Sequence, residues 1–282
     1  MKKGSLFIFG LFICISTYLV SRLYSEEESS SITVEDSLQR TLQFDEEPKK
    51  ILSLASSCTE ILTSLGLKDR LIEASEFKDF PTLYSRNREK YSLPKSRHSA
   101  DVVFIEGKEN YDFFKSELES RDWKVFVYHP SSLDDVFNSI EKISLIFGRQ
   151  RVSKTVNQGI KAIANFIKEQ SEPLKKPKIF IQTSLDPSKS APTQGFVHDV
   201  INVLNGVHVT AAHEAEKVVI ACPKDQFVSL KSEWNKMSGI SAVAENKIYW
   251  IDSKTILEPS PRIAEAFVRL SKIFYYPQTL EH

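Results

Sequence analysis

Short runs of apolar residues, many of them β-branched, alternate along the chain with segments whose apolar residues recur at helical spacing. Such runs predict four strands in the first half of the chain: Ile51–Leu54, Leu71–Ala74, Val102–Ile105 and Lys124–Tyr128. Helical spacing between some of these runs predicts helices over Thr59–Leu65 and Tyr111–Ser120. Strands that alternate with helices favour an α/β fold, in which helices cover a parallel sheet.

The clearest single transition follows Leu54, where the strand pattern changes to a helix start within three residues. Ser57 suits an N-cap, and Glu60 follows it at the spacing of a capping box. Gly66 ends the helical spacing, and the strand pattern Leu71–Ala74 comes soon afterwards. This segment therefore predicts a βαβ unit.

A long helical pattern occupies the middle of the chain. From Ser131 to Ser171 there is no proline, and apolar residues keep the spacing of an α-helix. A serine at the start suits an N-cap, and two acidic residues follow it in the first turn. One continuous helix would be about 55–60 Å long at 1.5 Å per residue, which exceeds the diameter of one domain. Two helices joined near Gly148 are the alternative.

A second set of strand and helix patterns follows Pro173. It predicts strands over Lys178–Thr183, Lys217–Ala221 and Lys247–Ile251, and helices over Phe196–Asn205 and Pro261–Tyr275. The chain thus consists of a first α/β lobe, a long backbone helix and a second α/β lobe. The expected boundaries are 48–130, 131–172 and 173–282, with residues 26–47 as a linker and leading segment.

The first 25 residues have the pattern of an export signal. Lys2 and Lys3 precede an apolar run that extends from Leu6 to Val20, and a polar stretch follows. Residues 23–25 offer a passable cleavage site, which predicts a cleaved signal peptide. An uncleaved membrane anchor is the alternative, although the run is shorter than the roughly 20 residues that a span prefers. Either way, we expect the rest of the chain to lie outside the cytoplasm.

Charge and composition argue against several functions. The 282 residues include 37 basic and 37 acidic side chains, so no basic surface indicates a nucleic-acid partner. Phosphate-cradling glycine motifs and hydrolase signatures are absent, which disfavours nucleotide binding and an enzyme. The histidines lack the spacing of zinc or haem sites, so neither a metal site of the protein's own nor a cofactor is expected. Cys58 and Cys222 are predicted to be two small buried residues.

Two separated segments carry a family resemblance. Residues 48–81, PKKILSLASSCTEILTSLGLKDRLIEASEFKDFP, resemble the start of the periplasmic solute-binding proteins that feed ABC importers for vitamin B12, iron-siderophores and haem. The family pattern there is roughly P-x-RIVSLxPSxTEILxALGLxDRIVGVTxxCDYP. Residues 242–277, AVAENKIYWIDSKTILEPSPRIAEAFVRLSKIFYYP, are similar to the family's AVKNGRVYxVDxxxxxRPGPRLxEGLExLAxLLYP.

The resemblance implies two Rossmann-like lobes with parallel-rich sheets, joined by a rigid helix, in a monomeric periplasmic protein. It also implies two partners: a large small-molecule ligand, which would be a corrinoid, a siderophore complex or haem, and an ABC permease. Aromatic side chains near the predicted strand ends suit a flat ligand of this kind. They are Phe77, Phe80, Tyr128, Phe196 and Trp250.

Ligands of open α/β sheets bind outside the carboxyl ends of the strands, so we expect both lobes to line one cleft. The ligand-binding candidates are Ser57, Glu76, Phe77, Glu106, His129, Phe196, Glu258 and Arg262. Glu258 and Arg262 are four residues apart at the start of the last predicted helix, a spacing at which they can pair on one face. The resemblance implies that Arg262, within the family's P-x-P-R motif, lies near the cleft. It also implies that the loop at Gly195 opens a helix whose amides face the cleft.

The family's permease-docking helices are shortened here. In the family, each lobe has a helix that resembles N-P-N-L-E-x-I-L-A-L-K-P-D-L-V, whose glutamate docks onto the permease. In this chain Ala100 and Asp101 stand where K-P-D would be, and Glu214 and Glu216 are the nearest candidates in the second lobe. We therefore expect an exported protein that captures cobalamin, a ferric siderophore or haem for an ABC importer. A divergent ligand-binding or cell-envelope interaction protein without permease docking is the alternative.

Overall fold

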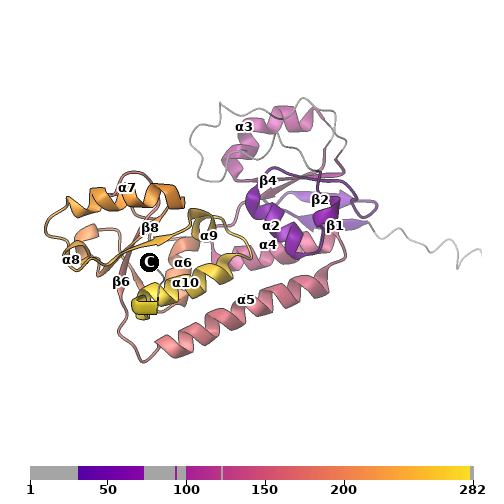
Figure 1. The fold of residues 1–282 in the computed structure, drawn as a ribbon. Coiled ribbons are helices and arrows are strands. Elements are labelled where there is room, and N and C mark those ends of the chain that lie inside the picture. Colours follow the sequence, from indigo (N-terminus) through magenta and orange to yellow (C-terminus); the bar gives the residue numbers. More distant parts are fainter. Residues whose placement is uncertain (1–30, 73–92, 94–99, 122, 280–282) are drawn as a thin grey trace, which may run out of the picture.

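The computed structural model describes residues 31–72, 93, 100–121 and 123–279. The predicted export segment and the candidates Glu76 and Phe77 lie outside these residues. Figure 1 shows two groups of strands and helices that follow each other along the chain, with one long helix extending below both of them. No helix in the described ranges is both long and apolar enough to cross a membrane.

The first lobe is built on a parallel sheet with the strand order β3-β4-β5. The strands are β3 (Ile51–Ser53), β4 (Val102–Glu106) and β5 (Val125–Tyr128). Helix α2 (Ser56–Ser64) packs on one face of the sheet, and α3 (Lys108–Glu119) packs on the other. The predicted strand over Leu71–Ala74 is described only at its start, where Leu71 forms an isolated parallel bridge to Ile51. A short 3-10 helix, η1 (Lys68–Arg70), precedes that bridge.

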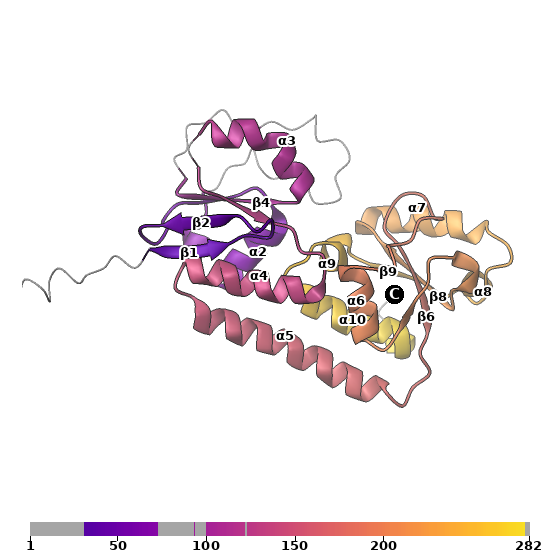
Figure 2. The same ribbon diagram turned by 180° about the vertical axis from the view of Figure 1, so that it is seen from behind.

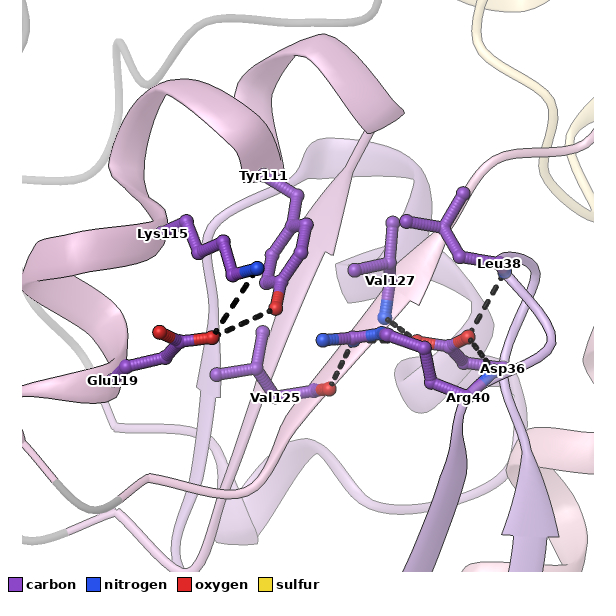
Figure 3. Close-up of polar contacts among 8 residues, drawn as sticks. All are labelled: Asp36, Leu38, Arg40, Tyr111, Lys115, Glu119, Val125 and Val127. Atoms are coloured by element: carbon purple, nitrogen blue, oxygen red, sulfur yellow. Dashed lines mark hydrogen bonds and ion pairs between the residues drawn. The ribbon is translucent and has the colours of Figure 1, made fainter.

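The leading segment contains an antiparallel hairpin, β1 (Ile32–Glu35) and β2 (Thr41–Phe44), which the sequence pattern did not predict. Asp36 in the hairpin turn is almost fully buried and accepts hydrogen bonds from the backbone amides of Leu38 and Val127. The Arg40 guanidinium pairs with the same carboxylate and donates to the Val125 carbonyl at 2.7 Å (Figure 3). These bonds attach the hairpin to the edge of β5.

Two helices, rather than one, connect the lobes. Helix α4 (Leu133–Ile146) ends before Gly148, whose φ of +60° is the left-handed conformation of a helix C-cap, and α5 (Gln150–Ser171) begins two residues later. The continuous helix is therefore wrong, and the alternative with a break near Gly148 is confirmed. The expected serine cap is also confirmed, because Ser132 and Asp135 form a capping box at the start of α4. Helix α5 extends along both lobes (Figure 2).

The second lobe contains a parallel sheet with the order β7-β6-β8-β9. Its strands are β6 (Lys178–Gln182), β7 (Val207–His208), β8 (Lys217–Ala221) and β9 (Ile248–Ile251). Its helices are α6 (Phe196–Val203), α7 (Lys224–Asn235), α8 (Ser241–Ala244), α9 (Ser253–Leu257) and α10 (Ile263–Tyr275), with short 3-10 turns η4 (Ala212–Glu214) and η5 (Pro277–Thr279). The sequence pattern missed β7, α7, α8 and α9.

One apolar core extends through both lobes. It includes Phe104 and Tyr128 of the first sheet, Ile181 and Val219 of the second sheet, and residues of α4, α5, α6 and α10 between them. The predicted fold class is confirmed: α/β, with two parallel sheets joined by helices. The exact lobe boundaries stay a prediction.

Candidate functional site

The carboxyl end of the first sheet contains a buried carboxyl group. Glu106 is the last residue of β4 and is only 1% exposed, and Ser57 lies in the first turn of α2. The Ser57 hydroxyl donates to Glu106 Oε2 at 2.7 Å. The structure thus brings two of the predicted ligand-binding residues together. It also shows that the predicted capping box of Ser57 and Glu60 is wrong, because Ala55 is the N-cap and no side chain caps α2.

Burial perturbs the ionisation of this group. Removal from water raises the pKa of Glu106 to about 7; the Ser57 hydrogen bond opposes the rise, and the charge of Glu258 adds to it. Burial also raises the pKa of the Cys58 thiol and of the Tyr128 phenol, both of which lie near Glu106. Near neutral pH, Glu106 is therefore divided between its charged and neutral forms.

The loop between α9 and α10 brings the second lobe against this end of the first sheet. The Tyr128 hydroxyl, at the end of β5, donates to the Pro259 carbonyl. Ser260 donates to the Glu60 carboxylate, and Arg262 forms an ion pair with it. We call residues 56–60 and 258–262, together with Glu106 and Tyr128, the interlobe seam.

The expected pairing of Glu258 with Arg262 is wrong. Glu258 is the C-cap of α9 and Arg262 is the N-cap of α10, so no helical turn joins them. Pro259 and Pro261 lie between the two residues, and each removes a backbone donor that a continuous helix needs. Arg262 pairs instead with Glu60 of the first lobe, which was not among the predicted ligand-binding residues.

Two buried oxygen atoms of the interlobe seam, Glu258 Oε2 and Ser56 Oγ, have no hydrogen-bond partner among the described residues other than each other. Glu258 is 7% exposed. Its burial raises its pKa, and the nearby Ser56 hydroxyl opposes that rise. Buried acceptors almost always find a donor, and the neighbouring Ser56 hydroxyl fills this role for Glu258.

His129 and Phe196 lie outside the interlobe seam. The His129 ring accepts a hydrogen bond from the Lys108 amide at 3.3 Å and lines a pocket of about 480 Å³ between the hairpin turn and α4. Phe196 is buried in the shared core at the start of α6. It follows Gly195, where a Cβ atom would lie 3.2 Å from the Ser131 carbonyl oxygen and where φ is +91°. A side chain is disfavoured at this contact between the start of α6 and the residues that precede α4.

The two candidates for permease docking lie on the second lobe. Glu214 is an exposed residue of η4, and Glu216 precedes β8 and forms an ion pair with Lys175 at 2.6 Å. Because Glu216 is at the amino end of its strand, it lies at the opposite edge of the second sheet from the carboxyl ends of the strands.

Sequence reasoning also missed a pair of histidines. His198 and His208 meet with their Nδ1 atoms 3.4 Å apart, and Ser190 lies 3.3 Å from the other nitrogen of His208. No group of three or more metal-ligating side chains occurs within the described ranges. Cys58 and Cys222 are free and buried, as predicted.

Comparisons with known proteins give consistent results. No family model matches the chain. The ABC transporter substrate-binding lipoprotein YvrC of Bacillus subtilis is 22% identical over 93% of this chain and 90% of that protein. The vitamin B12-binding protein of Vibrio vulnificus is 23% identical over 80% of this chain and 90% of that protein.

Solved structures share the fold. The periplasmic vitamin B12-binding protein BtuF of Vibrio cholerae aligns with a TM-score of 0.62 at 16% identity, over 83% of this chain and 99% of that one. IsdE of Staphylococcus aureus, solved with haem, aligns with a TM-score of 0.60 at 16% identity, over 80% of this chain and 98% of that one. The sequence relatives and the structural neighbours thus belong to one class of protein, the class that the two sequence motifs implied.

Proposed function

We propose that this chain, whose homologues and structural neighbours are ABC substrate-binding proteins for vitamin B12, haem and siderophores, captures one large metal-bearing ligand between its two lobes. One observation carries the proposal. Polar side chains of both lobes meet at the carboxyl end of the first sheet, where Tyr128, Ser260 and Arg262 form hydrogen bonds and an ion pair across the interlobe seam. This is where ligands of α/β sheets bind.

Binding requires no covalent step. Affinity would come from burial of the ligand's ring surface, while a few polar groups of the interlobe seam fix its orientation. The ion pair between Glu60 and Arg262 is partly exposed, with 22% and 34% of the two side chains accessible. Replacing this ion pair with contacts to the ligand costs little free energy, because ion pairs exposed to solvent contribute about 1 kcal/mol or less to stability.

Lobe closure would be small. The apolar core that runs through α4, α5, α6 and α10 joins both sheets, so a wide opening would expose packed side chains to water. Helix α5 contains 22 residues and is about 33 Å long, and it is packed against both α4 and α10. A stiff connection of this kind favours small adjustments of loops over a large hinge rotation.

Export and delivery complete the proposal. The first 25 residues would act as a cleaved signal or as an anchor, and an ABC permease would receive the ligand from a monomeric chain. A ligand-binding protein without permease docking is the second candidate. It is favoured by Glu216, whose carboxylate is already paired with Lys175.

The experiment is a titration of the purified chain, without residues 1–25, against cyanocobalamin, haemin, a ferric hydroxamate and a ferric catecholate. Isothermal titration calorimetry and tryptophan fluorescence should show one ligand bound at 1:1 stoichiometry with a Kd of about 10 μM or lower. Arg262→Ala should weaken that binding about tenfold or more, because a charged group of the seam is lost. Arg151→Ala, on the exposed surface of α5, is the matched control. Failure of all four ligands to bind would overturn the proposal.

A further inference from the structure

The histidine pair of the second lobe joins a helix to the edge of the sheet. His198 lies in the first turn of α6, and His208 ends β7, an edge strand of the second sheet. Their Nδ1 atoms are 3.4 Å apart, whereas the centres of the two rings are 5.6 Å apart. The rings are therefore not stacked on each other, and their Nδ1 edges face one another.

The hydrogen bonds of Ser190 assign the ring proton of His208. The Ser190 hydroxyl donates to the Val209 carbonyl at 3.4 Å, so its oxygen is left to accept from His208 Nε2, which lies 3.3 Å away. A neutral imidazole carries one ring proton, and a proton on Nε2 leaves Nδ1 with a free lone pair. Histidines that bind metals are oriented in this way, by a hydrogen bond from the nitrogen that does not bind the ion.

The distance between the two Nδ1 atoms distinguishes a hydrogen bond from a metal site. Hydrogen bonds from N–H groups in proteins are usually about 2.7–3.2 Å long, so a proton shared by the two rings would form only a long bond. Two nitrogens bound at about 2.05 Å to one tetrahedral Zn²⁺ lie about 3.3–3.4 Å apart. Neighbouring ligands of a square-planar ion would lie only about 2.8 Å apart. The observed 3.4 Å thus matches a tetrahedral ion.

The protein supplies two of the four positions around such an ion. The carboxylate of the adjacent Asp199 accepts from the Leu133 amide at 3.0 Å, and no third metal-ligating side chain joins the pair within the described ranges. His208 is buried, but His198 is partly exposed, so water reaches the pair at His198. Water or a small donor molecule would complete the coordination there.

We propose that His198 and His208 bind one tetrahedral divalent ion of the Zn²⁺ class, with Ser190 as a positioning residue for the His208 ring. The ion would connect α6 to β7, at the opposite edge of the second sheet from β9, the strand that leads into the interlobe seam. Binding replaces waters of the hydrated ion by two neutral imidazole nitrogens and needs no change of oxidation state. The site is a second binding site and does not depend on the function proposed above.

The test titrates Zn²⁺ into the chelator-treated chain, prepared without residues 1–25 and without a histidine tag, by calorimetry at pH 7.5. One ion should bind with a Kd of about 100 μM or lower, whereas Mg²⁺, which prefers oxygen ligands, should not bind. His198→Gln and His208→Gln should each weaken the binding of Zn²⁺ at least tenfold. His213→Gln, which removes an exposed histidine of the same lobe, is the matched control and should stay within twofold.

Nitrogen-15 NMR of the histidine side chains identifies the ligating atoms in the unmodified protein. Zn²⁺ should shift the Nδ1 resonances of His198 and His208, while Nε2 of both rings stays protonated. Ser190→Ala should weaken zinc binding about tenfold, as loss of a group that orients a metal ligand does. It should also raise the fraction of His208 that carries its proton on Nδ1 before zinc is added, which a purely structural role of Ser190 would not change.

Several results would overturn the proposal. One is a Kd for Zn²⁺ above about 100 μM in the unmodified protein, and another is a shift of other histidines in place of this pair. Unchanged affinity in His198→Gln and His208→Gln, with folding verified by circular dichroism melting, would contradict it as well. None of these results bears on the proposed capture of a large ligand, because zinc is titrated in its absence.

Discussion

Glu258 and Lys217 are both ionisable side chains that are less than one-tenth exposed, but their surroundings differ. Lys217, at the start of β8, donates to the carbonyls of Ile273 and Phe274 at 2.8 and 2.6 Å and so caps the end of α10. Glu258, between the lobes, has no donor for its Oε2 atom among the described residues other than the neighbouring Ser56 hydroxyl. Lys217 therefore stabilises the fold of the second lobe, whereas Glu258 lies at the boundary between the lobes, where we propose that the ligand binds.

The two lobes also differ in how their buried groups respond to acid. In the first lobe, burial raises the pKa of Glu106 to about 7. In the second lobe, burial and the neighbouring His198 lower the pKa of His208 to about 4. Both groups therefore change their proton occupancy relative to the unfolded chain in an overlapping range of pH, but with opposite effects on stability.

Lys217→Met tests whether Lys217 has the structural role that distinguishes it from Glu258. The substitution leaves the carbonyls of Ile273 and Phe274 without their donor, although it also removes a buried amine whose pKa is lowered to about 8. We expect a loss of about 2 kcal/mol in the free energy of unfolding, measured by urea denaturation at pH 7. Ligand affinity should not change. A large loss of affinity in a folded variant would show that Lys217 is more than a structural cap.

Glu106→Gln should reduce the loss of folding stability that the unmodified protein shows as the pH rises. The folded protein keeps the Glu106 proton up to about pH 7, whereas the unfolded chain releases it near its ordinary pKa of 4.5. The folded state therefore binds more protons in this window, and the free energy of unfolding falls as the pH rises through it. At pH 8 the variant should be more stable than the unmodified protein by roughly 1–2 kcal/mol. Equal stability of the variant and the unmodified protein at pH 8 would contradict the raised pKa of Glu106.

His208→Gln should reduce the loss of folding stability that the unmodified protein shows as the pH falls. The unfolded chain binds this proton below about pH 6.5, but the folded protein does not bind it until about pH 4. Stability is therefore lost as the pH falls from about 6.5 to 4. Removal of the imidazole should reduce that acid-induced loss by on the order of 1 kcal/mol, a figure reduced for solvent screening. Denaturation curves of the variant and of the unmodified protein at pH 4.5 and 7 measure this change. If the difference in stability between the two pH values is the same in both proteins, the prediction is wrong.

The sequence predicted the α/β class and most of the strands, because both depend on local apolar patterns. It also placed Ser57 and Glu106 together, since Ser57 follows one strand of the parallel sheet and Glu106 is at the carboxyl end of another. It missed the interlobe contact of Glu60 because the partner of this residue, Ser260, is 200 residues away. No local pattern shows that a tertiary contact will replace a predicted capping box.

Two other misses have local causes. The hairpin of β1 and β2 has only four residues per strand, with polar residues between the apolar ones, so its pattern was too short to stand out. The helical spacing continued across Gly148, and only the left-handed backbone conformation of this residue separates α4 from α5. A glycine permits this conformation but does not require it.

The most direct test of the account is the position of the ligand's metal in crystals of the complex, located by anomalous scattering at the cobalt or iron absorption edge. The account predicts a single peak between the lobes, with the ligand in contact with residues of both α2 and the 258–262 loop. A peak whose ligand touches only one lobe, or one in the pocket beside His129, would contradict it.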